Sequence, residues 1–89
     1  MQRQDVRIVN KLGLHARASA KLTHEAGRFA SEVWLSTNGR RINAKSIMGV
    51  MMLAAGKGTV LQVEASGPDE QEAVLAVVKL VNERFGERE

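Results

Sequence analysis

The stretch Leu61-Gln62-Val63-Glu64-Ala65-Ser66 alternates an apolar residue with a polar one at every position. Successive side chains of a strand point to opposite faces of a sheet, so this period predicts a strand with one buried face. Sheets that are covered on one face only are antiparallel, whereas parallel sheets are buried on both faces. The stretch therefore predicts an antiparallel sheet that packs against helices on one side.

Another strand is expected near the N-terminus. Between Gln4 and Val9, the apolar Val6 and Ile8 alternate with charged or polar residues. This is the same period of two, so the segment fits the same one-sided sheet.

The middle of the chain carries a hairpin signal. Asn38-Gly39 follows the apolar residues 33–35, and this dipeptide is typical of a two-residue turn in which both residues have positive φ. We therefore expect a strand on each side of the turn, with residues 40–43 as the return strand and Ile42 facing inward.

Two segments that flank this hairpin are expected to be helical. Residues 16–26 are rich in alanine, and Gly27 is expected to end their helix. Residues 46–54 form a shorter predicted helix, with Ser46 as its N-cap and Gly56 after its end. The apolar stripe of the first helix consists of Ala20, Leu22 and Ala26.

The last helix is expected to begin at Asp69, just after Pro68. Asp69 and Glu72 stand three residues apart, which is an aspartate variant of the capping box. Apolar residues follow at helical spacing, and Gly86 is expected to stop the helix. These apolar residues are Val74, Val77, Val78, Val81 and Phe85.

The predicted elements have the order βαββαβα. They indicate an α+β open-faced sandwich, with a four-stranded antiparallel sheet and three helices on one face. The chain has 89 residues, 44% of them hydrophobic, which suffices for one core. We therefore expect residues 1–89 to form a single domain and, by default, a monomer.

The composition argues against several classes of function. The chain has no cysteine and two histidines, so we expect neither a disulfide framework, nor a metal site, nor a cofactor. Its net charge of +3 comes from dispersed residues, and it has one Trp, two Phe and no Tyr, which disfavours nucleic-acid binding. Neither a signal peptide nor a membrane-inserting segment is visible. A cytoplasmic protein is expected.

The segment Gly13-Leu14-His15-Ala16-Arg17-Ala18 sets a histidine and an arginine two residues apart where the first helix begins. A helix N-terminus presents unpaired N–H groups and the positive end of the dipole, which together bind anions. Arg17 adds a planar, permanently charged donor at a place where a cation opposes the dipole. Because imidazole is a nucleophile near neutral pH, this pattern suits a phosphate that is held for transfer.

Three stretches resemble the histidine-containing phosphocarrier proteins (HPr) of the bacterial phosphotransferase system. They are residues 10–17 (Asn-Lys-Leu-Gly-Leu-His-Ala-Arg), 45–51 (Lys-Ser-Ile-Met-Gly-Val-Met) and 67–70 (Gly-Pro-Asp-Glu). The resemblance covers essentially the whole chain, including its length and the order of its elements.

This resemblance implies a carrier rather than an enzyme. His15 would accept a phosphoryl group on Nδ1 from phosphorylated enzyme I, which phosphoenolpyruvate charges, and would pass it to enzyme II A components. The Arg17 side chain and the first-turn amides at Ala16 and Arg17 would hold the group. The implied process is sugar transport.

The resemblance also implies roles for the helix after Ser46. Many family members are phosphorylated at this serine by an HPr kinase/phosphorylase, and a phosphate at a helix N-terminus is not expected to unfold the domain. Ile47 and Met48 are candidates for a partner-docking patch, with Met51 as a third. The core is expected to take Met51 or Met52.

Three alternative functions stay open. The first is a nitrogen-related paralogue that serves a regulatory relay, and the second is a regulatory interaction domain without the chemistry. The third is a small RNA-binding domain. His15 and Arg17 argue against the second, and the scarcity of aromatic residues argues against the third.

Two residues depart from the family pattern. Ala18 stands where many members have proline, so the first helical turn is expected to be less rigid. Ser19 replaces a small apolar residue and adds a hydroxyl of unassigned role. His24 lies later in the same helix without a partner motif and is expected at the surface.

Overall fold

The computed structural model describes residues 1–89 and contains four strands, three α-helices and a short 3₁₀ turn. Their bounds, in chain order, are β1 (Gln2–Arg7), α1 (Ala16–Gly27), β2 (Glu32–Thr37), β3 (Arg40–Asn43), α2 (Ile47–Met52), β4 (Val60–Ser66), α3 (Glu70–Asn82) and η1 (Arg84–Gly86). The predicted order βαββαβα is confirmed.

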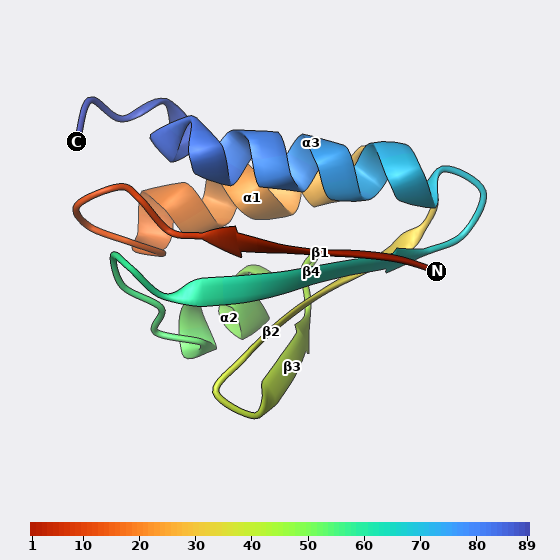
Figure 1. Cartoon of the computed structure of the whole chain (residues 1–89), viewed down its shortest axis with the longest axis horizontal. Coiled ribbons are helices and arrows are strands. Elements are labelled where there is room, and N and C mark those ends of the chain that lie inside the picture. The colour runs from red at the N-terminus through yellow and green to blue at the C-terminus, as the bar shows by residue number, and fades with distance from the viewer.

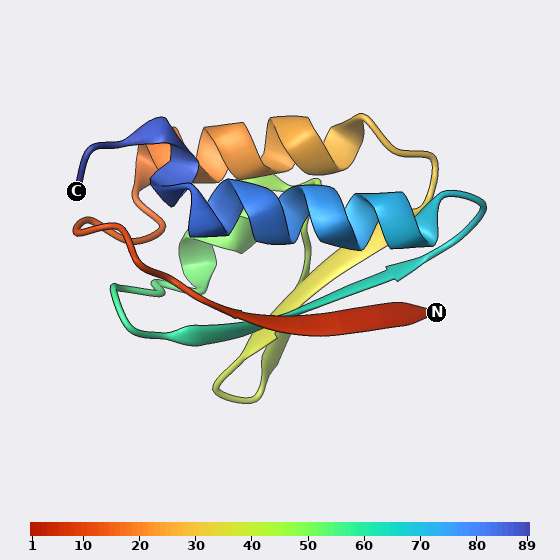
Figure 2. The same ribbon diagram turned by 45° about the horizontal axis from the view of Figure 1, so that its top comes forward.

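The strands form one antiparallel sheet in the order β1-β4-β2-β3. Strand β4, whose alternation predicted the sheet, pairs with both β1 and β2, and its Leu61, Val63 and Ala65 are fully buried. The helices α1 and α3 lie side by side over one face of the sheet, and α2 contacts α1 (Figures 1 and 2). The predicted α+β open-faced sandwich is confirmed.

The hairpin between β2 and β3 also has the predicted form. Asn38 has φ 51° and Gly39 has φ 78°, so both turn residues lie in the left-handed region. Ile42 of the return strand is half-buried and packs against the core. The local turn chemistry therefore sets the register of this pair of strands.

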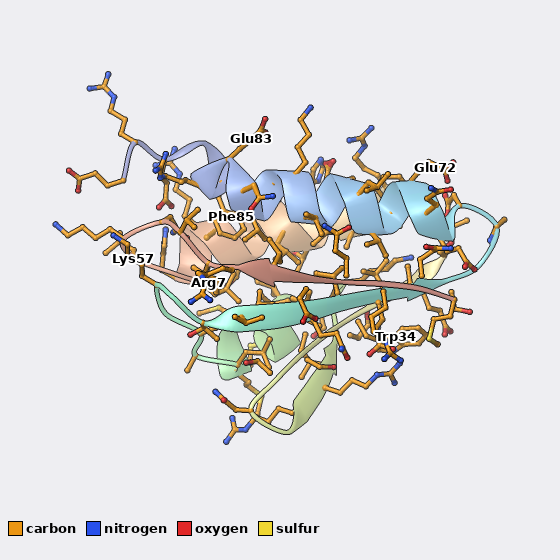
Figure 3. The ribbon with its side chains drawn as sticks, viewed as in Figure 1. Arg7, Trp34, Lys57, Glu72, Glu83 and Phe85 are labelled. Atoms are coloured by element: carbon orange, nitrogen blue, oxygen red, sulfur yellow. The ribbon has the colours of Figure 1, made fainter.

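The core contains 21 buried apolar residues that lie between the sheet and the helices. Phe85 is fully buried, but it lies beyond α3, in η1, where its φ is 54°. The prediction that Phe85 continues the stripe of the last helix was wrong, because the helix ends at Asn82 and the chain then turns back. Figure 3 shows Phe85 near the end of α3, whereas the side chain of Glu83 projects outward.

Helix α1 is rotated relative to its predicted apolar stripe. Leu22 is buried as expected, but Ala20 is exposed, and Ala18 and Ser19 are fully buried in its place. The prediction for Ala20 was wrong because three alanines close together do not by themselves show which face of a helix is buried.

Asp69 is the N-cap residue of α3, but its side chain makes no capping hydrogen bond. Its carboxylate accepts hydrogen bonds from the backbone N–H groups of Ala30 and Ser31, at 2.9 Å each, and from the Ser31 hydroxyl at 2.5 Å. The Ser31 hydroxyl first, and then the amide of Ala30, hold the pKa of Asp69 below its ordinary value of 3.8. The predicted capping box with Glu72 was therefore wrong, and Asp69 instead ties the start of α3 to the segment before β2.

Helix α2 has the predicted start and a different end. The Ser46 side chain accepts a hydrogen bond from the backbone N–H of Gly49 at 3.1 Å, so the predicted N-cap is confirmed. The helix ends at Met52, and the residue with positive φ after it is Ala54, at 48°, instead of the expected Gly56.

Gly13 brings the loop before α1 against the segment that follows α2. Its φ is +65°, and a Cβ atom there would lie 2.5 Å from the carbonyl oxygen of Ala55. The neighbouring N–H of Leu14 donates to that same oxygen at 2.9 Å. Only glycine fits both the left-handed conformation and this close approach.

We expect Gly13→Ala to lower the free energy of unfolding by about 2–4 kcal/mol, because a new Cβ adds left-handed strain and overlaps Ala55. Urea denaturation followed by circular dichroism measures the change. The matched control is Gly27→Ala, where a Cβ meets open space, and a gain of up to about 1 kcal/mol is expected. Equal stability of Gly13→Ala and the wild-type protein would contradict the close approach.

Candidate functional site

His15 is the N-cap residue of α1, with φ −71° and ψ 176°. Its side chain makes no capping hydrogen bond, and its imidazole is 28% exposed. The backbone N–H groups of Ala16 and Arg17 have no hydrogen-bond partner within the protein. The imidazole therefore lies beside a helix N-terminus that has free donors for an anion.

Arg17 is exposed and forms no ion pair with any carboxylate. Its side chain and that of His15 line the same open pocket, together with the C-terminal residues of the chain. A guanidinium without a protein partner is available for a bound anion. The structure thus brings together the histidine, the arginine and the first-turn amides that the sequence singled out.

Glu87 joins this site, although no sequence pattern predicted it. Its Oε2 accepts a hydrogen bond from Nε2 of His15, and its Oε1 accepts one from Nδ2 of Asn10 at 3.0 Å. Nδ1 of His15 makes no hydrogen bond. His15 and Glu87 are 72 residues apart, so no local motif could have indicated the contact.

The chain reversal after α3 places Glu87. Arg84, Phe85 and Gly86 all have positive φ, and the buried ring of Phe85 anchors the turn. The Lys21 ammonium donates to the carbonyl oxygen of Phe85 at 2.7 Å, which ties this turn to α1. The C-terminal segment is thereby held next to the start of α1.

The charges around Glu87 favour its ionised form. Burial by itself would raise the pKa of this carboxyl group, but the hydrogen bonds from Asn10 and His15 lower it, as do the charges of His15 and Lys21. The net result is a pKa below the ordinary value of 4.5. Glu87 is therefore a carboxylate at neutral pH.

Buried polar groups brace the loop that carries His15. The fully buried Ser19 donates its hydroxyl hydrogen to the carbonyl oxygen of Leu14 at 3.1 Å, which gives this departure from the family pattern a structural role. Asn10, also fully buried, donates to the carbonyl oxygen of Gly13 at 3.0 Å. His24 is exposed, as predicted.

Helix α2 presents an exposed apolar surface. We call this surface the α2 patch, and it consists of Ile47 (42% exposed), Met48 (70%), Met51 (42%) and Met52 (64%). The prediction that Met51 or Met52 enters the core was wrong, because Val50 and Leu53 fill that side of the helix. A contiguous apolar surface of this kind is typical of a protein-interaction site.

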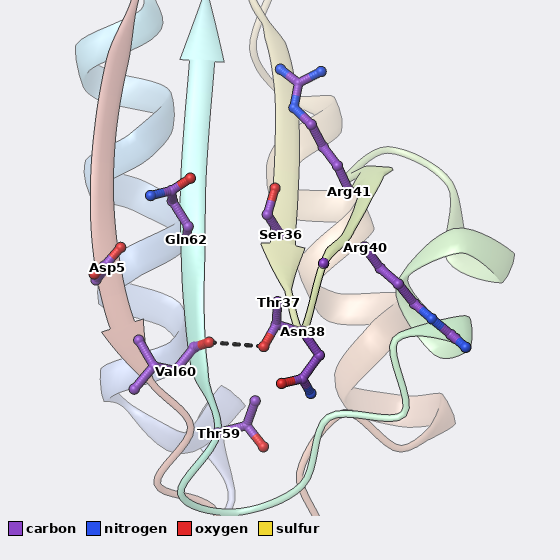
Figure 4. A pocket seen from close by; sticks show the side chains of 10 residues that line it. Asp5, Ser36, Thr37, Asn38, Arg40, Arg41, Thr59, Val60 and Gln62 are labelled. Carbon is purple, nitrogen blue, oxygen red and sulfur yellow. Dashed lines mark hydrogen bonds between the residues drawn. The ribbon is translucent and has the colours of Figure 1, made fainter.

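A second hollow lies on the uncovered face of the sheet, away from His15 (Figure 4). Its arginines are already engaged: Arg40 donates to the Met52 carbonyl oxygen at 3.0 Å, and Arg41 lies over the Trp34 ring at 4.2 Å. It holds neither a histidine nor any other predicted site residue. The polar side chains that line it include Asp5, Ser36, Thr37, Arg40, Arg41 and Gln62.

No group of three or more His, Cys, Asp or Glu side chains is placed to hold a metal ion. None of the helices combines the length and the apolar character that crossing a membrane requires.

Comparisons with known proteins agree on one family. Residues 2–83 match the family model described as the PTS HPr component phosphorylation site. The chain is 62% identical over 89 residues to the phosphocarrier protein HPr of Cupriavidus necator and 57% identical over 89 residues to that of Neisseria meningitidis, with 100% of each chain covered. The crystal structure of HPr-C-His from Thermoanaerobacter tengcongensis matches with a TM-score of 0.96 at 42% identity, again over 100% of both chains.

Proposed function

Because the chain belongs to the HPr family of phosphocarrier proteins and therefore serves the phosphoryl relay of the phosphotransferase system, we propose that it carries the phosphoryl group on Nδ1 of His15. The observation that supports this choice is the arrangement of the imidazole. Its Nδ1 is unpaired, and it lies at an open helix N-terminus beside the free guanidinium of Arg17.

The transfer itself needs positioning and charge stabilisation. The lone pair of Nδ1 attacks phosphorus in line, an N–P bond forms, and the bond from phosphorus to the donor breaks with its electron pair on the donor. The N–H groups of Ala16 and Arg17 and the Arg17 guanidinium hold the phosphoryl oxygens. Because this site is open to solvent, the group is held lightly and is passed on readily.

The phosphoryl relay implies two kinds of protein partner, a donor and an acceptor of the phosphoryl group. Phosphorylated enzyme I donates the group, and enzyme II A components accept it, so the chain is a substrate of phosphotransferases and not itself an enzyme. The α2 patch docks these partners one after the other, since methionine side chains adapt to different surfaces. The single domain, the monomeric state and the cytoplasmic location stay predictions.

Ser46 is the proposed regulatory residue. Its hydroxyl caps α2 at the edge of the α2 patch, next to Ile47. A phosphate placed there by an HPr kinase/phosphorylase adds negative charge beside the apolar docking surface while it keeps favourable contact with the helix N-terminus. The segment around Ser46 favours the sugar branch of the system over the nitrogen-related relay.

Incubation with enzyme I, Mg²⁺ and phosphoenolpyruvate is expected to place one acid-labile phosphate on the protein. His15→Ala abolishes the signal, and His24→Ala leaves it unchanged. Arg17→Ala lowers kcat/KM for charging about 100-fold, because the cation that holds the transferred oxygens is lost. Charging that survives His15→Ala would refute the acceptor assignment, and charging only by a nitrogen-related enzyme I homologue would favour that branch.

For docking, we expect Met48→Asp to raise the KM for enzyme I about tenfold, because it places a charge in the α2 patch. The matched control is Leu75→Asp, since Leu75 is also an exposed apolar residue (52%) but lies on α3. Steady-state charging rates measure both variants. Equal KM values for the two variants would remove the α2 patch from the docking surface.

For regulation, a phosphate on Ser46 is expected to leave the circular dichroism spectrum unchanged and to raise the KM for enzyme I about tenfold, through its charge beside the α2 patch. Homogeneous phosphoserine protein tests this directly, with Ser66 phosphorylated at a distance from the patch as the control. An unchanged rate of His15 charging would disprove the regulatory role.

A further inference from the structure

We infer that Glu87 is a positioning residue for His15: its carboxylate holds the ring proton on Nε2 and so keeps the lone pair on Nδ1, where the phosphoryl group is to be accepted. This inference rests on the proposed function. It concerns a residue outside the sequence motif, which the tertiary structure alone brings to the site.

The contact with Glu87 fixes the tautomer of the His15 imidazole. A neutral imidazole carries one proton, on either Nδ1 or Nε2, and the hydrogen bond to one nitrogen decides which. An ionised carboxylate only accepts hydrogen bonds, so the contact between Glu87 and Nε2 requires the proton on Nε2. Nδ1 is then the unprotonated nitrogen, and it is the one without a partner.

Asn10 sets the orientation of the Glu87 carboxylate. Asn10 is fully buried, and its Nδ2 donates both to Oε1 of Glu87 and to the carbonyl oxygen of Gly13, at 3.0 Å each. Asn10 therefore holds Glu87 against the same loop that carries His15. Two hydrogen bonds thus link three side chains: the buried amide of Asn10 orients the Glu87 carboxylate, and this carboxylate orients the nucleophilic ring of His15.

Glu87 also faces the positive charge that the His15 ring gains when it is phosphorylated. When Nδ1 forms its bond to phosphorus and the donor leaves with the former bonding pair, Nε2 keeps its proton and the ring becomes a cation. The Glu87 carboxylate already faces that proton, and a hydrogen bond between a cation and a carboxylate is stronger than one between neutral groups, so the contact stabilises the charged ring. When the acceptor takes the phosphoryl group, the electron pair of the N–P bond returns to Nδ1 and the neutral tautomer is restored.

The C-terminal segment is built to make this contact. The buried Phe85 ring and the bond from Lys21 to the Phe85 carbonyl oxygen hold the turn directly before Glu87. The backbone N–H of Lys11 also donates to the carbonyl oxygen of Glu89, which ties the end of the chain to the loop before His15. Both sides of Glu87 are thus attached to the rest of the molecule.

The test uses the full chain with Glu87→Ala and Glu87→Gln, and with Glu83→Ala as the control that removes an equal charge from an outward-facing position (Figure 3). ¹⁵N NMR of the His15 ring in alkaline buffer, where ordinary histidines are neutral, reports the tautomer. Charging by enzyme I and phosphoenolpyruvate reports the rate. Thermal unfolding checks that each variant is folded.

Glu87→Ala is expected to give a mixture of the two tautomers and a kcat/KM for charging about tenfold lower. Glu87→Gln has one acceptor oxygen for the two donors, Asn10 Nδ2 and His15 Nε2–H, and it lacks the charge. Its share of the Nε2–H tautomer and its charging rate are therefore expected to lie between those of the wild-type protein and those of Glu87→Ala. Glu83→Ala matches the wild-type protein in both measurements.

An unchanged tautomer and rate in Glu87→Ala would overturn the inference, and so would faster charging, which would mean that Glu87 competes with the phosphoryl group. Failure of the proposed function gives a different result, since the wild-type protein would then take no phosphate on His15. In that case, the tautomer of the unphosphorylated ring still decides whether Glu87 places the proton.

Discussion

The approach of the loop before α1 to the segment after α2 is the contact on which the site depends. Gly13 lies so close to the carbonyl oxygen of Ala55 that no Cβ atom fits between them, and Leu14 donates to the same oxygen. This contact sets where α1 begins. His15 therefore meets the solvent as the N-cap of a helix whose later residues, such as Leu22, are buried in the core.

A carrier needs a site that is well placed but weakly binding, because donor and acceptor use it in turn. The structure combines a fixed frame with an open surface. Ser19 and Asn10 brace the loop from inside through buried hydrogen bonds, while Arg17 stays exposed and unpaired. The loop can be held rigidly and still bind the phosphoryl group weakly, because the buried hydrogen bonds of Ser19 and Asn10 lie on its inner side and Arg17 lies on its solvent side.

Much of the fold was predictable because it depends on local patterns. The alternation in β4, the Asn38-Gly39 turn and the Ser46 cap each have a short-range physical cause, and the structure contains all three. The predictions that were wrong concern residues for which tertiary contacts compete with local ones. Asp69 has the position of a helix cap, yet Ser31 and the amide of Ala30 are better placed to donate to its carboxylate.

The sequence by itself determined the family, the order of the elements and the two residues of the motif, His15 and Arg17, because these depend on neighbours within a few positions. Only the tertiary structure decided which methionines stay at the surface of α2 and that Glu87 reaches the imidazole. The physical reason is chain reversal. The turn at residues 84–86 brings Glu87 to His15, 72 positions away in the sequence. Neither hydrophobic periodicity nor composition can predict such a contact.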